Sequence, residues 1–123
     1  GASLPADILW TAKISAMMTE DCGACVQLSI KMALEAGVNK ELVMEIIKSP
    51  FKLEGAHKLI YTYAKAVAMN AENHTSLQKE VEANYSAEQL TELALSIAST
   101  KIYPTIKRAL GDFQTCSLYE FKF

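Results

Sequence analysis

Apolar residues recur every three or four positions along most of the chain, which is the period of an amphipathic α-helix. This pattern predicts an all-α protein of about six helices. Within the second of them, Cys25, Leu28, Met32 and Ala36 form one apolar stripe at helical spacing. The expected helical segments are residues 4–18, 22–36, 40–48, 54–71, 76–84 and 86–110.

The first half of the chain carries local start and stop signals for these helices. Thr19 or Asp21 can cap the second helix, and Gly37 suits the position just after its end. Asn39 is expected to cap the third helix. Pro50 is expected to terminate that helix, because the residue before a proline avoids helical dihedral angles.

The last predicted helix has a start signal and an internal break. Ser86 begins a capping box, in which Gln89, three positions later, is the reciprocal partner of Ser86. Pro104 lies inside the helical pattern and is expected to kink or divide the helix, since proline lacks an N–H and clashes with the preceding turn. Gly111 then ends it.

Residues 112–123 form an aromatic tail of different character. Tyr119, Phe121 and Phe123 alternate with charged residues, which is a period of two. No other segment has a strand pattern, so the tail cannot join a sheet within one chain. It carries too much apolar area to remain in solvent, so we expect it to pack on its own domain or on a neighbouring subunit.

Composition and charge narrow the class of protein. The chain has 123 residues, half of them hydrophobic, and a net charge of −2. These values favour one domain over residues 1–123, with residues 1–3 interpreted as a cloning remnant. The sequence lacks the basic block of a nucleic-acid-binding protein and the roughly 18-residue apolar run of a membrane span. Helices this rich in small apolar residues also predict a homo-oligomer, in which further copies hide surplus apolar surface.

Cys22 and Cys25 stand three positions apart at the start of the second predicted helix. Residues at i and i+3 share a helix face, so the two sulfurs can meet. The free N–H groups and the positive end of the helix dipole favour a thiolate there, which lowers the pKa of the more N-terminal thiol, Cys22. One thiolate can then attack a peroxide or a disulfide, and the other thiol resolves the product as an intramolecular disulfide. The chain has three cysteines, an odd and low count that does not indicate a secreted disulfide framework, so we expect a reducing compartment, the cytoplasm.

Two other interpretations of this pair compete with the redox one. A structural zinc site needs four ligands, and the remaining candidates, His57, His74 and Cys116, are scattered along the chain. We therefore expect no metal and no bound cofactor. The pair can also be two small buried residues, since free cysteine is among the most buried residue types.

The segment "CGAC", followed by "MALEAGVNKELVMEII", resembles the carboxymuconolactone decarboxylase-like superfamily, and specifically its AhpD-like alkylhydroperoxidase branch. Residues 22–47 carry most of the likeness. "YTYAKAVAMN" and "YSAEQLTELALSIASTKIYPTIKRALG" are more weakly similar to later helices of the family, so the likeness spans roughly residues 4–111.

This resemblance implies an AhpD-like helical fold that assembles into trimers or hexamers. It implies an antioxidant thiol peroxidase that reduces hydroperoxides, with a lipoyl or thioredoxin-like thiol reductant to recycle its disulfide. It further implies that Cys25 attacks the peroxide and Cys22 resolves the product. The helix-dipole argument favours Cys22 as the more reactive thiol, and both assignments stay open.

The sequence departs from the family motif at two positions. The motif has a glutamate about a dozen residues before the first cysteine and a histidine four residues after the second, and these form a proton relay. Trp10 and Ser29 stand at these positions, and neither is a useful base. Glu20, beside the pair, and His57, at the edge of an apolar stripe, are candidate replacements, and Ser29 can still hydrogen-bond the Cys25 sulfur or hold a water. The candidate catalytic residues are therefore Cys22, Cys25, Ser29, Glu20 and His57.

Two further functions are considered beside the peroxidase. A redox-sensing or structural oligomer would keep the fold and the CxxC motif but turn over little without the relay. A decarboxylase of the carboxymuconolactone type is disfavoured, because that branch does not depend on CxxC. Its substrate carboxylate would also need a cation such as Lys13, Lys101 or Arg108 to turn inward, whereas helical Lys and Arg normally face solvent.

Overall fold

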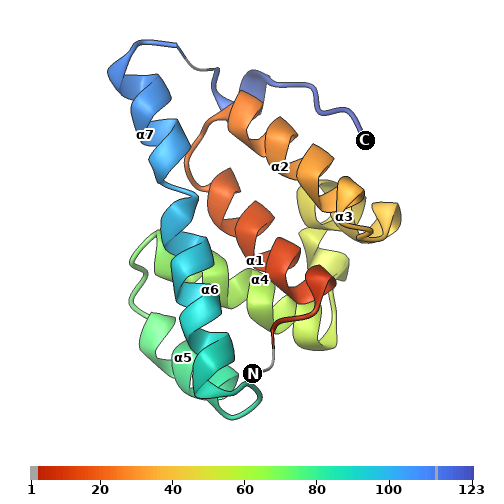
Figure 1. Ribbon diagram of the computed structural model, residues 1–123, viewed down its shortest axis with the longest axis vertical. Helices are drawn as coiled ribbons and strands as arrows, with labels where there is room; N and C mark the ends of the chain where they lie inside the picture. The colour runs from red at the N-terminus through yellow and green to blue at the C-terminus, as the bar shows by residue number, and fades with distance from the viewer. Residues whose placement is uncertain (1–2, 113) are drawn as a thin grey trace.

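The computed structural model describes residues 3–112 and 114–123, which fold as helices without strands (Figure 1). The prediction of an all-α chain is thus confirmed over the described residues. The last predicted helix is divided, so the described part of the chain holds seven α-helices rather than six. They are α1 (Ala6–Met18), α2 (Gly23–Glu35), α3 (Lys40–Lys48), α4 (Gly55–Ala68), α5 (His74–Glu82), α6 (Ala87–Ser99) and α7 (Ile102–Ala109), with two 3₁₀ turns, η1 (Pro50–Lys52) and η2 (Cys116–Leu118).

Helix α1 is the central element of the fold. Its Ile8 and Ala12 join a core shared with α4, α5 and α6. Its Trp10 and Ile14 join a second core, shared with α2, α3 and the C-terminal tail. A helix that packs on both faces is apolar nearly all round, which explains why α1 has no clear polar side.

The predicted helix ends are largely confirmed. Helix α2 ends before Gly37, whose φ of +88° lies in the left-handed region that glycine adopts easily. The Asn39 side chain accepts a hydrogen bond from the Glu41 N–H at 2.7 Å and so caps α3. Ser86 and Gln89 form the reciprocal capping box at the start of α6.

Pro104 explains the division of the last predicted helix. Helix α6 ends at Ser99 and α7 begins at Ile102, which places Pro104 in the first turn of α7. Proline is tolerated there because the N–H groups of a first turn have no partner within the helix. Pro104 is also the buried residue of α7, so it anchors this short helix.

The structure corrects the predicted orientation of α2. Its buried face is formed by Val26, Ile30 and Ala33, together with Gly23 and Cys25 of its first turn. Leu28 and Met32, from the predicted stripe, are 44% and 45% exposed. The helix is therefore rotated, and this stripe borders a surface pocket instead of the core.

The predicted cap of α2 was also wrong. Cys22 occupies the N-cap position and its side chain makes no capping hydrogen bond. The Thr19 hydroxyl instead donates to the carbonyl oxygen of Ala16 at 2.7 Å. Asp21 adopts a left-handed conformation, with φ of 53°, and its carboxylate binds the tail.

The aromatic tail packs on its own domain, one of its two expected positions. Phe121 and Phe123 contact the core formed by α1, α2 and α3. The side-chain amide of Gln27 binds the backbone of Lys122 twice, donating to its oxygen at 2.8 Å and accepting from its N–H at 2.7 Å. In Figure 1 this segment runs beside α2 toward α3. Residue 113 of the tail lies outside the described residues, and so do residues 1 and 2, which belong to the segment interpreted as a cloning remnant.

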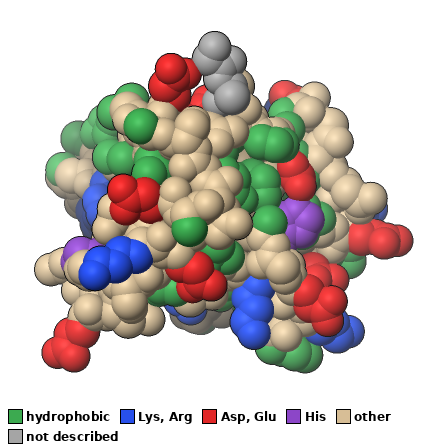
Figure 2. Space-filling model, turned by 90° about the horizontal axis from the view of Figure 1, so that it is seen from below, with side chains coloured by type: hydrophobic (Ala, Val, Ile, Leu, Met, Phe, Trp, Pro, Cys, Tyr) green, Lys and Arg blue, Asp and Glu red, His purple; other side chains and the backbone are tan. Residues whose placement is uncertain are grey.

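The surface carries charges of both signs. Figure 2 shows acidic and basic side chains interspersed on the face seen from below, with hydrophobic side chains scattered between them. No helix in the described ranges is long and apolar enough to cross a bilayer.

Candidate functional site

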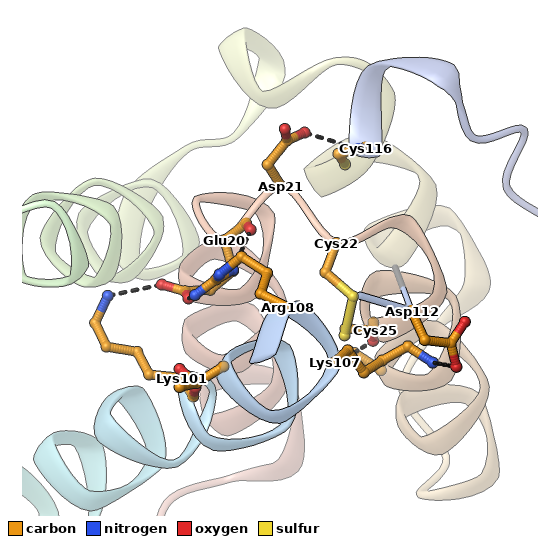
Figure 3. The surroundings of a disulfide bond; sticks show 11 residues. Glu20, Asp21, Cys22, Cys25, Lys101, Lys107, Arg108, Asp112 and Cys116 are labelled. Atoms are coloured by element: carbon orange, nitrogen blue, oxygen red, sulfur yellow. Dashed lines mark hydrogen bonds and ion pairs between the residues drawn. A yellow bond between two sulfur atoms is a disulfide. The ribbon is translucent and has the colours of Figure 1, made fainter. Parts of the chain in front are cut away.

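Cys22 and Cys25 are joined by a disulfide bond at the start of α2 (Figure 3). Their Cα atoms are 5.3 Å apart, within the usual range for a disulfide. Both residues are buried, with exposed fractions of 0% and 1%. The Val26 N–H bonds to the carbonyl oxygen of Cys22, so the N–H groups before Val26 have no partner inside the helix. The pair therefore lies at the positive end of α2.

The C-terminal tail closes one side of this site, over Asp21 and Gly23, the residues on either side of Cys22. The Gly23 N–H donates to the carbonyl oxygen of Gln114 at 2.6 Å, and the Cys116 N–H donates to Asp21 Oδ1 at 2.8 Å. Tyr119 lies directly on Gly23, so that a Cβ atom at Gly23 would come within 2.5 Å of the Tyr119 side chain. A glycine is therefore required for this close approach.

A small pocket opens on the other side of the site, at Cys25. Its volume is about 200 Å³, and its lining is mainly apolar. The lining residues come from α1, α2 and the α6–α7 region. They are Trp10, Lys13, Met17, Cys25, Leu28, Ser29, Met32, Ser99, Thr100 and Tyr103. Cys22 does not line this pocket, so the two cysteines have different surroundings.

The two positions that depart from the family motif both line this pocket. Trp10 is buried and offers an aromatic wall. The Ser29 hydroxyl donates to the carbonyl oxygen of Cys25 at 3.1 Å, not to the sulfur. Ser29 therefore bonds back onto its own helix, and neither residue can take a proton from Cys25.

Glu20 is held by two cations and is poorly suited to act as a base. Its carboxylate lies 2.7 Å from Lys101 Nζ and 3.0 Å from Arg108, and its side chain is 8% exposed. Figure 3 shows both cations reaching Glu20 from the α7 side. Burial alone would raise the pKa of Glu20, but the hydrogen bonds and charges of Lys101 and Arg108 outweigh it and lower that pKa below its ordinary value. Glu20 thus fixes α7 to the α1–α2 connection.

The structure does not bring His57 to the pair. Its Nε2 lies 2.7 Å from Asp7 Oδ2, in the first turn of α1, whereas Cys22 follows the end of that helix. The intervening length of α1 is roughly 16 Å at about 1.5 Å per residue. The proposed relay role of His57 is therefore dropped, because the Asp7 carboxylate holds its ring at the wrong end of α1.

Cys116, the third cysteine, is a free thiol in η2. Burial raises its pKa, and the charge of Asp21 raises it further. Both effects make Cys116 a weaker nucleophile than an ordinary surface cysteine.

The sequence suggested Lys13 only as a cation for the substrate of the disfavoured decarboxylase and did not place it beside Cys25. Lys13 and Met17 follow Trp10 by three and seven positions, so the three share one face of α1. That spacing would have revealed Lys13 once Trp10 was placed near the pair. Tyr103 also lines the pocket, and it comes from α7, which Lys101 and Arg108 tie to Glu20.

No group of three or more His, Cys, Asp or Glu side chains within residues 3–112 and 114–123 could hold a metal ion. Comparisons of the chain with protein-family models, with curated proteins and with solved structures found no match. The resemblance noted in the sequence therefore stays a prediction, and function must be argued from the site.

Proposed function

We propose that the protein is a thiol-dependent peroxidase that reduces hydroperoxides with the Cys22–Cys25 pair. The observation that carries this proposal is the asymmetry of the site. The pair lies at a helix N-terminus, where a thiolate is stabilised, and only Cys25 lines a pocket. A small apolar pocket suits an organic hydroperoxide as well as hydrogen peroxide.

The proposed reaction has three steps. The Cys25 thiolate attacks the outer oxygen of ROOH, the O–O bond breaks, and Cys25 becomes a sulfenic acid while RO⁻ takes a proton from solvent. The Cys22 thiol then attacks the Cys25 sulfur, releasing water and forming the disulfide. A dithiol reductant finally reduces the disulfide and becomes a disulfide itself. The sum is two electrons and two protons passed from the reductant to ROOH, which yields ROH and water.

The surroundings of the two sulfurs favour Cys25 as the attacking residue. Hydroperoxide can approach Cys25 through the pocket, whereas Cys22 is fully buried, does not line this pocket, and lies between two residues that the tail binds. The helix-dipole argument favoured Cys22, but a lowered pKa is of no use where the substrate cannot reach the sulfur. We therefore assign Cys25 as peroxidatic and Cys22 as resolving, in agreement with what the resemblance implies.

The reductant must reach a disulfide that is almost completely buried. A lipoyl group fits this site better than a thioredoxin-like protein does, because a small dithiol can use the pocket at Cys25 whereas a protein reductant needs an exposed disulfide. Recycling of this kind needs a reducing compartment, so the proposal places the protein in the cytoplasm with a role in antioxidant defence.

Exposed apolar side chains support the proposed homo-oligomer. Ile102, Ile106 and Leu110 follow one another at four-residue spacing on α7, and each is about half exposed or more. Leu28 and Met32 add exposed apolar surface at the pocket rim. A trimer or hexamer could cover this surface, and light scattering on the purified protein would show a monomer if the proposal is wrong.

The function is tested by oxidising the reduced protein with one equivalent of hydrogen peroxide or an alkyl hydroperoxide. Samples are quenched with an alkylating reagent over time and mapped by mass spectrometry. We expect rapid formation of the Cys22–Cys25 disulfide with Cys116 still alkylated. Cys25→Ser should abolish peroxide consumption, Cys22→Ser should leave a sulfenic acid on Cys25, and Cys116→Ser serves as the matched control. Peroxide consumption that survives Cys25→Ser would refute the assignment.

A redox-sensing oligomer is the second candidate function, favoured by the complete burial of Cys22. In that case the disulfide forms once, slowly, and no reductant recycles it. The two functions are separated by turnover: a peroxidase consumes many equivalents of hydroperoxide with dihydrolipoamide present, whereas a sensor consumes one.

A further inference from the structure

Lys13 places a positive charge in the pocket of Cys25. It lies one turn after Trp10 on α1, is half buried, and lines the same pocket as the reactive sulfur. Its Nζ lies 4.7 Å from the centroid of the Trp10 ring, a cation–π contact that holds the ammonium group against a wall of the pocket.

The other charges around the disulfide are already engaged. Glu20 is neutralised by Lys101 and Arg108. The Asp21 carboxylate accepts from the Cys116 N–H. On α7, Lys107 Nζ lies 3.6 Å from Asp112 Oδ2.

Lys13 itself has no carboxylate within 4.0 Å among the described residues. Glu88 and Glu92 of α6 line a neighbouring groove with it, and Glu92 accepts from the Leu4 N–H. Within the Cys25 pocket, Tyr103 is the other titratable side chain, while Ser99 and Thr100 contribute neutral hydroxyls. Lys13 is thus the charged side chain that shares the pocket with Cys25.

We propose that Lys13 is a catalytic residue that stabilises the thiolate of Cys25 by charge, in place of the proton relay that Trp10 and Ser29 cannot supply. The inference deepens the proposed function, because it takes Cys25 as the nucleophile. An opposite charge near a thiol favours its ionised form, so the thiol loses its proton to solvent at neutral pH without a dedicated base. The same charge also favours RO⁻ as it leaves the attacked hydroperoxide.

The test measures the pKa of Cys25 from the pH dependence of its alkylation by iodoacetamide. The background is Cys22→Ser with Cys116→Ser, in which Cys25 is the only thiol. Lys13→Met and Lys13→Gln should each raise the pKa of Cys25 by roughly one unit, which slows labelling at pH 7 up to about tenfold. Above the raised pKa, the limiting rate should match that of the parent.

Two comparison variants separate charge from packing. Lys13→Arg keeps the charge and should leave the pKa of Cys25 at its parent value. Lys31→Met removes an exposed cation of α2, which lies beside Glu35, and should change nothing. An unchanged pKa in Lys13→Met and Lys13→Gln, or a raised pKa in Lys13→Arg, would overturn the proposal. Alkylation does not depend on peroxide turnover, so the role of Lys13 can fail this test while the peroxidase activity is confirmed, and the reverse.

Discussion

Replacement of Gly23 by alanine gives a sharp test of how the tail closes the site. A Cβ atom at this position would lie 2.5 Å from the Cβ, Cγ and Cδ2 atoms of Tyr119. Ordinary van der Waals contact begins near 3.4 Å, so Tyr119 would have to retreat by about 1 Å. These atoms are at the root of the tyrosine side chain, so rotation of the ring alone cannot relieve the clash.

The expected cost follows from two opposing effects. Overpacking of a tight contact destabilises a protein by about 1–3 kcal/mol. Alanine has a better helix propensity than glycine by up to about 1 kcal/mol, which offsets part of this at the first position of α2. We expect Gly23→Ala to lower the free energy of unfolding by about 1–2 kcal/mol.

A double-mutant cycle with Tyr119→Gly isolates the contact. Glycine is needed at position 119, because the Tyr119 Cβ is itself one of the clashing atoms. In the Tyr119→Gly background, Gly23→Ala should be neutral or stabilising, which gives a coupling of about 2 kcal/mol by urea denaturation. Equal destabilisation by Gly23→Ala in both backgrounds would refute the reasoning, since the loss would then not come from Tyr119.

The same variant reports on access to Cys22. If strain lifts the tail from Gly23, the disulfide should be reduced faster by dithiothreitol than in the parent. Gln27→Ala removes both hydrogen bonds to Lys122 and should speed reduction through a different contact. Unchanged reduction rates in both variants would mean that the tail does not control access to the pair.

Two further predictions concern stability. The folded-state pKa of Glu20 lies below its ordinary value of 4.5. Its ion pairs with Lys101 and Arg108 therefore stabilise the protein above about pH 4.5, and this stabilisation is lost as the pH falls through the folded-state pKa. Thermal melts should therefore show Glu20→Gln to be about 1 kcal/mol less stable than the parent at pH 7, with the gap closing in acid; a constant gap would contradict this. Ser86→Ala should lower the free energy of unfolding in urea by about 1 kcal/mol, because the Gln89 N–H loses its partner, and an unchanged midpoint would mean that the capping box contributes nothing.

The sequence predicted the local part of the fold well, because its signals are local. The capping residues Asn39 and Ser86, the stop at Gly37 and the break at Pro104 each act within one or two turns. Local chemistry of this kind does not depend on where the rest of the chain packs, so it can be read from the residues alone.

The sequence could not predict the orientation of α2 or the surroundings of the pair. Leu28 and Met32 satisfy the helical period as well as the residues that are actually buried. Packing against α1, α3 and the tail decides which face of α2 is buried. Asp21 has a suitable side chain for a helix cap, but it binds the backbone of Cys116 instead. His57 has a partner 50 positions away, Asp7, which no periodicity reveals.

The tail and α7 complete a site whose cysteines lie near the other end of the chain. The contacts that surround the pair join residues separated by 81 to 95 positions: Glu20 with Lys101, and Asp21 and Gln27 with the tail. These hydrogen bonds lie at the protein surface, so each is individually weak. Their effect depends on all of them forming together. The first turn of α2 uses nearby residues, whereas the hydrogen bonds of Asp21 and Gly23 to the tail need the C-terminal segment in place. If the proposed function holds, two separable parts of the protein set the reactivity of the pair: the pocket, which lies at Cys25, and the tail, which binds Asp21 and Gly23 on either side of Cys22.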